Sequence, residues 1–265
     1  MSRTPPPVHA DSKYKLAALC LRSFKAALGD LRIKLWAILD DCPPEYEALF
    51  TSLFPAEDLV LVRCAGIGNQ ATFRRQIELL VSQRDADYVF FAEDDYFYLP
   101  ASFAPALSLL AHNADVDFCS LADHPDLHRD QFHRHKMMLK VESGQVWRTA
   151  NGTTCTFLTR AEILRATQAT LMSYARITRW NVDACMWLSL TKHHVLSPYD
   201  LVTQPFIFPY RGASQVFAWY YNWRQILFGR RYTLYMPVPS LAAHMDAGRM
   251  PPYVEWQREF KKYTD

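Results

Sequence analysis

Apolar residues recur at helical spacing near the start of the chain and then gather into short unbroken runs. The first segment carries apolar residues on one helical face as far as Leu28. Asp11 or Ser12 precedes it, and the side chain of either can accept hydrogen bonds from the first amides of a helix. Gly29 follows, a residue typical of helix ends. We therefore expect a helix over residues 12–28.

Predicted strands and helices then alternate. This order predicts an α/β fold with a mostly parallel central sheet and helices on both faces. In such sheets, ligands bind beyond the carboxyl ends of the strands. The elements expected here are a strand at 33–41, a short helix after Pro44, a strand at 58–64, a helix over 70–83 and a strand at 85–95.

Helices and strands are also expected in the second half of the chain, but they do not alternate regularly. The last third is rich in proline and aromatic residues and shows no clear period, so it predicts an irregular C-terminal region. A chain of 265 residues fits one core, and we expect a single domain over 1–265. The further elements expected are helices over 101–112, 160–174 and 182–191, strands at 116–123 and 153–159, and a hairpin over 138–149.

Composition narrows the class of protein. Half of the residues are hydrophobic and 21% are charged, as in an ordinary globular protein. The net charge of +2 indicates no nucleic-acid partner. The six cysteines form no CxxC pair, which favours reduced thiols over a zinc ribbon. Without an apolar run of about 18–20 residues or a signal peptide, we expect a cytoplasmic protein, or one on the inner face of a membrane.

Five acidic residues follow two of the predicted strands. Asp40 and Asp41 end the first, and Glu93, Asp94 and Asp95 end the third. Parallel strands would bring these carboxylates to one rim, where a cation would relieve their repulsion. Mg²⁺ and Mn²⁺ prefer such oxygen ligands and often share them with substrate phosphates. The alternative is a solvated acidic turn without a metal.

The order of these elements resembles the nucleotide-binding half of GT-A fold glycosyltransferases, including those like family 2. The resemblance covers about residues 12–125 and rests on the helix opening at GNQATFRRQIELL and on the strand that ends in EDD. It implies a Rossmann-like GT-A fold, with residues 1–125 binding a nucleotide-sugar and 126–265 the acceptor. It also implies roles for single residues: Asp95 as the metal ligand, Glu93 and Asp94 at the donor sugar or ribose, Asp40 or Asp41 at the base or ribose, and Arg3 in a loop that touches the nucleotide.

Two further residues come from the second half of the chain. In many GT-A enzymes a C-terminal histidine completes the metal shell, and His244 matches that position; a loop histidine bonded to backbone is the alternative. An inverting reaction needs a general base, and Asp183, at the start of an apolar helix, is the candidate. Simple helix capping explains Asp183 equally well.

Residues 215–232 are both aromatic and basic. A helix there would place Phe217, Tyr220, Tyr221, Arg224 and Phe228 along one side. Core packing accounts for most of these aromatics, whereas contact with a membrane interface and stacking on acceptor sugars are the alternatives.

A histidine-rich loop over residues 123–136 lacks the ligand spacing of a zinc site. Asp123, at a predicted strand end, is the one residue of that loop that we connect with the site.

Together these patterns predict a metal-dependent glycosyltransferase. It would transfer a sugar from a nucleotide-diphosphate donor to a glycan or lipid-linked acceptor, with inversion, in the assembly of surface polysaccharide or glycoconjugates. Mn²⁺ or Mg²⁺ would be its cofactor. One alternative is a nucleotidyltransferase acting on sugar phosphates, although its Gly-rich basic loop is not visible in the sequence. The other is a carbohydrate- or lipid-binding module of the same fold without turnover.

Overall fold

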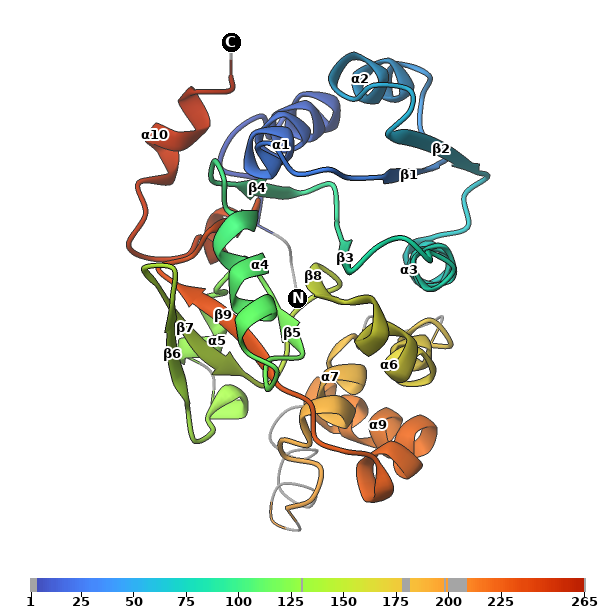
Figure 1. Cartoon of the computed structure of the whole chain (residues 1–265), viewed down its shortest axis with the longest axis vertical. Coiled ribbons are helices and arrows are strands. Elements are labelled where there is room, and N and C mark those ends of the chain that lie inside the picture. The colour runs from blue at the N-terminus through green and yellow to red at the C-terminus, as the bar shows by residue number, and fades with distance from the viewer. Residues whose placement is uncertain (1–3, 130, 178–181, 198, 200–208, 265) are drawn as a thin grey trace.

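The protein has a mixed α/β structure (Figure 1), known from a computed structural model that describes residues 4–129, 131–177, 182–197, 199 and 209–264. The helices are α1 (Lys13–Leu28), α2 (Glu45–Leu53), α3 (Asn69–Val81), α4 (Phe103–His112), α5 (Asp126–Arg129), α6 (Ala161–Tyr174), α7 (Ala184–Thr191), α9 (Pro209–Phe228) and α10 (Trp256–Lys261). The strands are β1 (Leu35–Asp40), β2 (Leu59–Cys64), β3 (Tyr88–Phe91), β4 (Tyr96–Tyr98), β5 (Phe118–Cys119), β6 (Leu139–Glu142), β7 (Gln145–Ala150), β8 (Phe157–Arg160), β9 (Leu234–Val238) and β10 (Ala242–His244).

The main sheet has six strands in the order β3-β8-β5-β9-β7-β6. Of its pairings, β5 with β9 is parallel and the others are antiparallel. The prediction of a mostly parallel, Rossmann-like sheet is therefore not met. The physical reason is that β8 returns between β3 and β5 without a crossover helix before it, and the hairpin of β6 and β7 adds a second reversal. Alternation in the first third of the chain could not reveal either.

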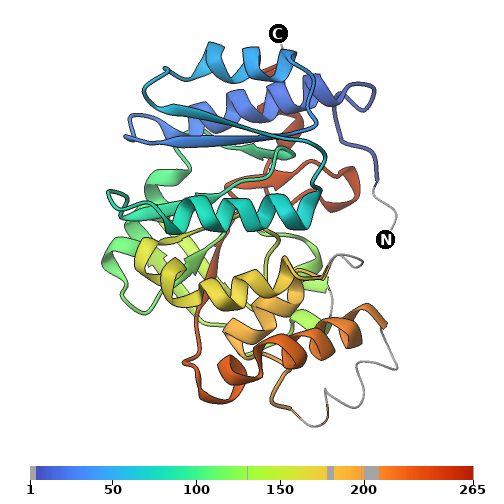
Figure 2. The same ribbon diagram turned by 90° about the vertical axis from the view of Figure 1, so that its right-hand side faces the viewer.

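Helices cover both faces of this sheet, as predicted (Figures 1 and 2). Alternate residues along its strands point to opposite sides. Phe118 and Phe157 pack in a core with α3, α6, α7 and α9. Cys119 and Leu158, their chain neighbours, pack in a second core with α1 and α4.

Two smaller pairs of strands lie beside the main sheet. β1 and β2 are parallel, as the sequence predicted for this part. β4 and β10 are antiparallel, and their register places His244 opposite Tyr96. This pairing joins two segments that are far apart in the sequence, and the sequence showed no sign of either strand.

Most predicted elements are present within a few residues of their expected bounds. The Ser12 hydroxyl accepts a hydrogen bond from the Lys15 amide at the start of α1, and Gly29 ends that helix with φ of 55°. The hairpin of β6 and β7 turns at Ser143 and Gly144, both with positive φ, a conformation that glycine adopts without strain.

No helix in the part of the chain that the structure describes is long and apolar enough to cross a bilayer.

Candidate functional site

Asp95 and His244 meet at the end of β4. The Nε2 atom of His244 lies 3.1 Å from Oδ2 of Asp95. The backbone supports this contact, because the Met245 amide donates to the carbonyl of Asp95 at 2.8 Å. The structure thus brings together the two residues that were predicted to share a metal. The pairing of β10 with β4 places His244 opposite Tyr96, the residue that follows Asp95.

Glu93 belongs to the same group. It follows β3, and Thr156 precedes β8; Phe91 and Phe157, the last pair in register between these strands, bring the two residues to the same edge. The Thr156 hydroxyl donates to Oε2 of Glu93 at 2.9 Å. The sequence did not single out Thr156, since a threonine before a strand carries no distinctive signal.

The environment of Glu93 alters its protonation. Solvent reaches this side chain, although protein surrounds the carboxyl group closely. Burial, with a further contribution from the charge of Asp95, raises the pKa of Glu93 from 4.5 to about 7, while the Thr156 hydrogen bond acts in the opposite direction. Near neutral pH this carboxyl group can therefore both donate and accept hydrogen bonds.

His244 is held close to an anion. Burial works to lower its pKa, but the hydrogen bond that the ring donates to Asp95 and the charges of Asp95, Glu93 and Asp246 outweigh burial, so its pKa is raised. Its other ring nitrogen, Nδ1, is buried and forms no hydrogen bond. Within the described residues, the His244 ring therefore makes its hydrogen bond through Nε2, to Asp95.

The donor set of this pair fits a divalent cation that is shared with a substrate. The described residues include no group of three or more His, Cys, Asp or Glu side chains arranged to hold a metal ion. A carboxylate and an imidazole alone would leave most coordination positions open. Mg²⁺-type ions are commonly held by one or two protein ligands together with substrate phosphates and water.

A buried hydrogen-bond network lies behind this pair, and the sequence analysis did not find it. The Tyr96 hydroxyl is 2.9 Å from Nε2 of His124 and 2.8 Å from Oγ1 of Thr154. The ring centroids of Tyr96 and His244 are 5.2 Å apart. Burial is the main cause that lowers the pKa of His124 to about 3, so its ring is neutral.

A neutral buried histidine makes stability depend on pH. The unfolded chain binds a proton at His124 near pH 6.5, whereas the folded chain does so only near pH 3, so the free energy of unfolding falls as the pH drops below 6.5. We expect one such residue to contribute about 1.4 kcal/mol per pH unit in this range. Urea unfolding between pH 7.5 and 5 should show a shallower decline for His124→Gln than for the wild type. Equal slopes would contradict the prediction.

Asp40 has a structural role at the end of β1. Its two carboxylate oxygens accept hydrogen bonds from the amides of Ile67 and Gly68, each at 2.8 Å. These bonds, that of Gly68 first, lower the pKa of Asp40. Gly66 and Gly68 both have positive φ, which lets this loop turn its amides toward the carboxylate at the entrance to α3.

Asp41 and Asp94 are exposed and lie on the same side of the molecule. Burial raises the pKa of the Cys42 thiol, and the charges of Asp94, Asp40 and Asp41 add to the rise. The acids at the ends of β1 and β3 are therefore close enough to act on one group, although these strands belong to different sheets and not to one parallel sheet as predicted. Asp41, unlike Asp40, directs its carboxylate to solvent.

Asp183 lies at the start of α7, where its Oδ1 accepts a hydrogen bond from the Ala184 amide at 2.9 Å. Its charge also contributes to the raised pKa of Glu93, which places it within electrostatic range of the acidic group. Both interpretations of Asp183, as a helix cap and as a site residue, therefore agree with its position.

Asp123 takes part in contacts other than those of the acidic group. Its carboxylate binds the buried guanidinium of Arg148 and, at 2.7 Å, the Nε2 atom of His128. The Ser240 hydroxyl accepts from its amide at 2.8 Å. This group stabilises β7 against the loop after β5, so Asp123 stays outside the proposed chemistry. Arg3 lies outside the described residues.

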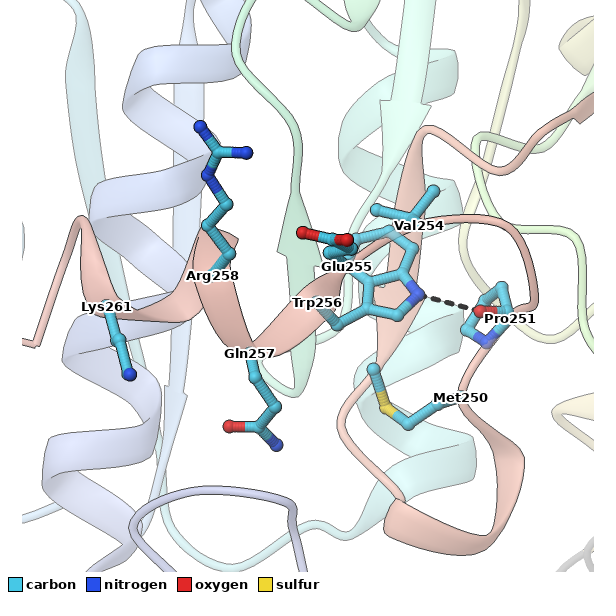
Figure 3. Close-up of a pocket in the computed structure, with 8 residues that line it drawn as sticks. All are labelled: Met250, Pro251, Val254, Glu255, Trp256, Gln257, Arg258 and Lys261. Carbon is cyan, nitrogen blue, oxygen red and sulfur yellow. Dashed lines mark hydrogen bonds between the residues drawn. The ribbon is translucent and has the colours of Figure 1, made fainter.

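A separate pocket lies on the C-terminal segment (Figure 3). Its wall includes the Trp256 ring, whose Nε1 donates to the carbonyl of Pro251 at 2.8 Å. None of the predicted site residues lines it, so we do not assign it to the acidic site. The lining residues are Met250, Pro251, Val254, Glu255, Trp256, Gln257, Arg258 and Lys261.

No protein-family model matches the chain, and no match to it was found among curated proteins.

Proposed function

We propose that the protein is a metal-dependent glycosyltransferase of the GT-A type, which uses a nucleotide-diphosphate sugar as its donor. The observation that carries the proposal is the contact between Asp95, which follows a buried strand, and His244, which returns from the C-terminal segment. Glu93 lies in the same group. A carboxylate and imidazole pair beside further acids suits Mn²⁺ or Mg²⁺ bound together with a diphosphate.

The proposal gives each residue a task. Asp95 and His244 would hold the ion, whose positive charge would stabilise the leaving diphosphate. Glu93 would hydrogen-bond a hydroxyl group of the donor sugar, and its carboxyl group accepts a hydrogen bond from the Thr156 hydroxyl. Tyr96 packs against the His244 ring and keeps it in place.

The nucleotide would lie toward the end of β1. Asp41 and Asp94 have exposed carboxylates there, which can accept hydrogen bonds from ribose hydroxyls or from a base. We assign no nucleotide contact to Asp40, because the loop amides already use both of its oxygens. Asp183 would take the proton of the acceptor hydroxyl. The acceptor class, a glycan or a lipid-linked sugar, and the part in surface polysaccharide or glycoconjugate assembly belong to the same proposal.

The function is tested by a panel of nucleotide-diphosphate sugars with the purified protein, with Mn²⁺ and with EDTA. We expect one donor to release its nucleotide diphosphate only in the presence of Mn²⁺. In calorimetry, His244→Ala should weaken Mn²⁺ and nucleotide binding together, because the diphosphate is held through the ion. His112→Ala, a change in an exposed histidine on α4, serves as the control.

Four outcomes would contradict parts of this proposal. Metal-independent nucleotide binding in the wild type would contradict the proposed metal site. Unchanged nucleotide affinity of His244→Ala at limiting Mn²⁺ would contradict the role of His244 as a metal ligand. Pyrophosphate release from nucleoside triphosphates with sugar phosphates would favour a nucleotidyltransferase, and metal-dependent binding without turnover of any donor would favour a binding module.

A further inference from the structure

The exposed side of α9 carries a stripe of large apolar residues. Val216, Tyr220, Trp223 and Leu227 follow one another at intervals of four, three and four residues, the spacing of one helical face. The backbone departs from helical geometry at Asn222, between Tyr220 and Trp223, so these residues lie on two helical parts of α9 that are joined by a kink. Their exposed fractions are 62%, 73%, 44% and 50%, and that of Phe228 at the end of the helix is 78%. We name these five residues the α9 stripe.

The opposite side of α9 holds the helix firmly in the protein. Ala218 and Ile226 are buried in the core with α6 and α7. The buried amide of Asn222 donates to the hydroxyls of Ser173 and Ser189 at 2.9 and 3.1 Å. The α9 stripe faces solvent, since the opposite side of α9 makes these contacts with the core.

This finding changes the interpretation of the aromatic residues in 215–232. Phe217 and Tyr221 are partly buried against the core, so core packing explains them. Tyr220, Arg224 and Phe228 are exposed, so the five residues that were predicted to share one side of the helix are divided between the core and the surface. Val216, Trp223 and Leu227, which complete the stripe, were not predicted to lie on this side.

We propose that the α9 stripe binds the surface of an anionic lipid bilayer, with α9 parallel to the membrane plane. The first argument is charge. The segment from Leu201 to His244 contains no Asp or Glu, and Arg224 and Arg231 are exposed at or just beyond the C-terminal half of α9. The Arg224 guanidinium lies over the Trp223 ring, 5.2 Å from its centroid. Negative lipid headgroups attract such arginines, whereas a neutral apolar partner would gain nothing from them.

The second argument is the type and position of the residues. Tyr and Trp are enriched at membrane interfaces, because their rings are apolar and their tips are polar. An interfacial helix combines an apolar face with flanking basic residues. Figures 1 and 2 show α9 at the end of the molecule away from α1 and α2.

The test uses the full chain, without donor or metal, in flotation with vesicles. We expect binding to vesicles of phosphatidylglycerol and phosphatidylcholine that weakens in high salt, and little binding to pure phosphatidylcholine. Leu227→Ser with Phe228→Ser should lower the partition coefficient at least about tenfold. The matched control is Leu139→Ser with Val141→Ser, which removes two equally exposed apolar residues on β6 and should leave binding unchanged.

Charge is tested separately. Arg224→Glu should weaken binding by roughly tenfold or more, since each basic residue near an anionic surface contributes about fivefold. Arg75→Glu, on the exposed side of α3, is its control. Arg230 is unsuitable for this purpose, because it binds the buried carboxylate of Asp117 at 2.5 and 3.2 Å and its reversal would disturb the fold.

A direct readout avoids dependence on folding of the variants. Trp223 is exposed, so lipids with brominated acyl chains should quench wild-type fluorescence, and Trp223→Phe should remove most of that quenching. Absence of wild-type binding to anionic vesicles would overturn the proposal. So would a dimer in sedimentation that Leu227→Ser with Phe228→Ser converts to a monomer, because a second copy would then cover the stripe. Either result leaves the proposed enzymatic function untouched, since this test involves no turnover.

Discussion

Asp95→Asn should reduce metal-dependent donor turnover by roughly 10³-fold, while the protein stays folded. The change removes one charge at nearly constant shape. A metal ligand that supplies several kcal/mol of transition-state stabilisation corresponds to a rate loss of this size. The backbone contact between the Asp95 carbonyl and the Met245 amide does not involve the side chain, so the pairing of β4 and β10 should persist. The measurement is nucleotide-diphosphate release in saturating Mn²⁺.

The control for this prediction is Asp87→Asn. Asp87 is an exposed acid just before β3, at the opposite end of the strand from the acidic group. It should keep the wild-type rate, and thermal melting should show that both variants are folded. Normal metal-dependent turnover by Asp95→Asn would refute the role of Asp95.

The first third of the chain was predictable because its signals are local. Ser12 and Gly29 mark the ends of α1, and an unbroken apolar run with acids after it marks β1. The parallel pairing of β1 with β2 follows from the helix between them. The acids after β1 and β3 lie near each other although these strands belong to different sheets, so the rule for the strand ends of one parallel sheet does not explain their proximity.

The remaining sheet was not predictable, because its pairings join distant segments. β8 has four residues and β5 has two, too few for a period to appear in the sequence. Whether such a strand pairs in parallel depends on neighbours more than 30 residues away along the chain. The interior of the main sheet is apolar on both faces, so alternation of polar and apolar residues gives no information about direction.

The residues of the candidate site were likewise only partly predictable, because their contacts join distant segments. Asp95 was visible because three acids in a row after an apolar run are unusual. His244 was predicted from a resemblance to GT-A enzymes, because the sequence around it does not indicate which residue it contacts. The three-residue pairing of β10 with β4 brings it to Asp95. Asp40 shows the reverse, because its sequence position did not reveal that the Ile67 and Gly68 amides engage both of its oxygens.

Asp183→Asn should reduce turnover by roughly 10²–10⁴-fold while donor affinity stays near the wild-type value. General base catalysis contributes a factor of this size, because the acceptor hydroxyl must lose its proton as the new bond forms. Replacement by Asn distinguishes the two roles considered for Asp183, general base and helix cap. The side-chain oxygen of Asn can still accept the hydrogen bond that Asp183 now accepts from the Ala184 amide, and Asn caps helices about as well as Asp. A residue that only caps α7 would therefore keep both its rate and its stability.

Asp183→Ala supplies the second comparison. It removes the cap as well as the carboxylate, so it should lose about 1 kcal/mol in the free energy of unfolding, a loss that Asp183→Asn should not share. If both variants lose turnover equally but only Asp183→Ala loses stability, the rate depends on the carboxylate and not on the helix end. If Asp183→Asn keeps the wild-type rate, Asp183 is a cap alone. The anomeric configuration of the product, measured by NMR, gives an independent answer, because a retained configuration requires no base at this position and would leave the Asp183 carboxylate without a catalytic task.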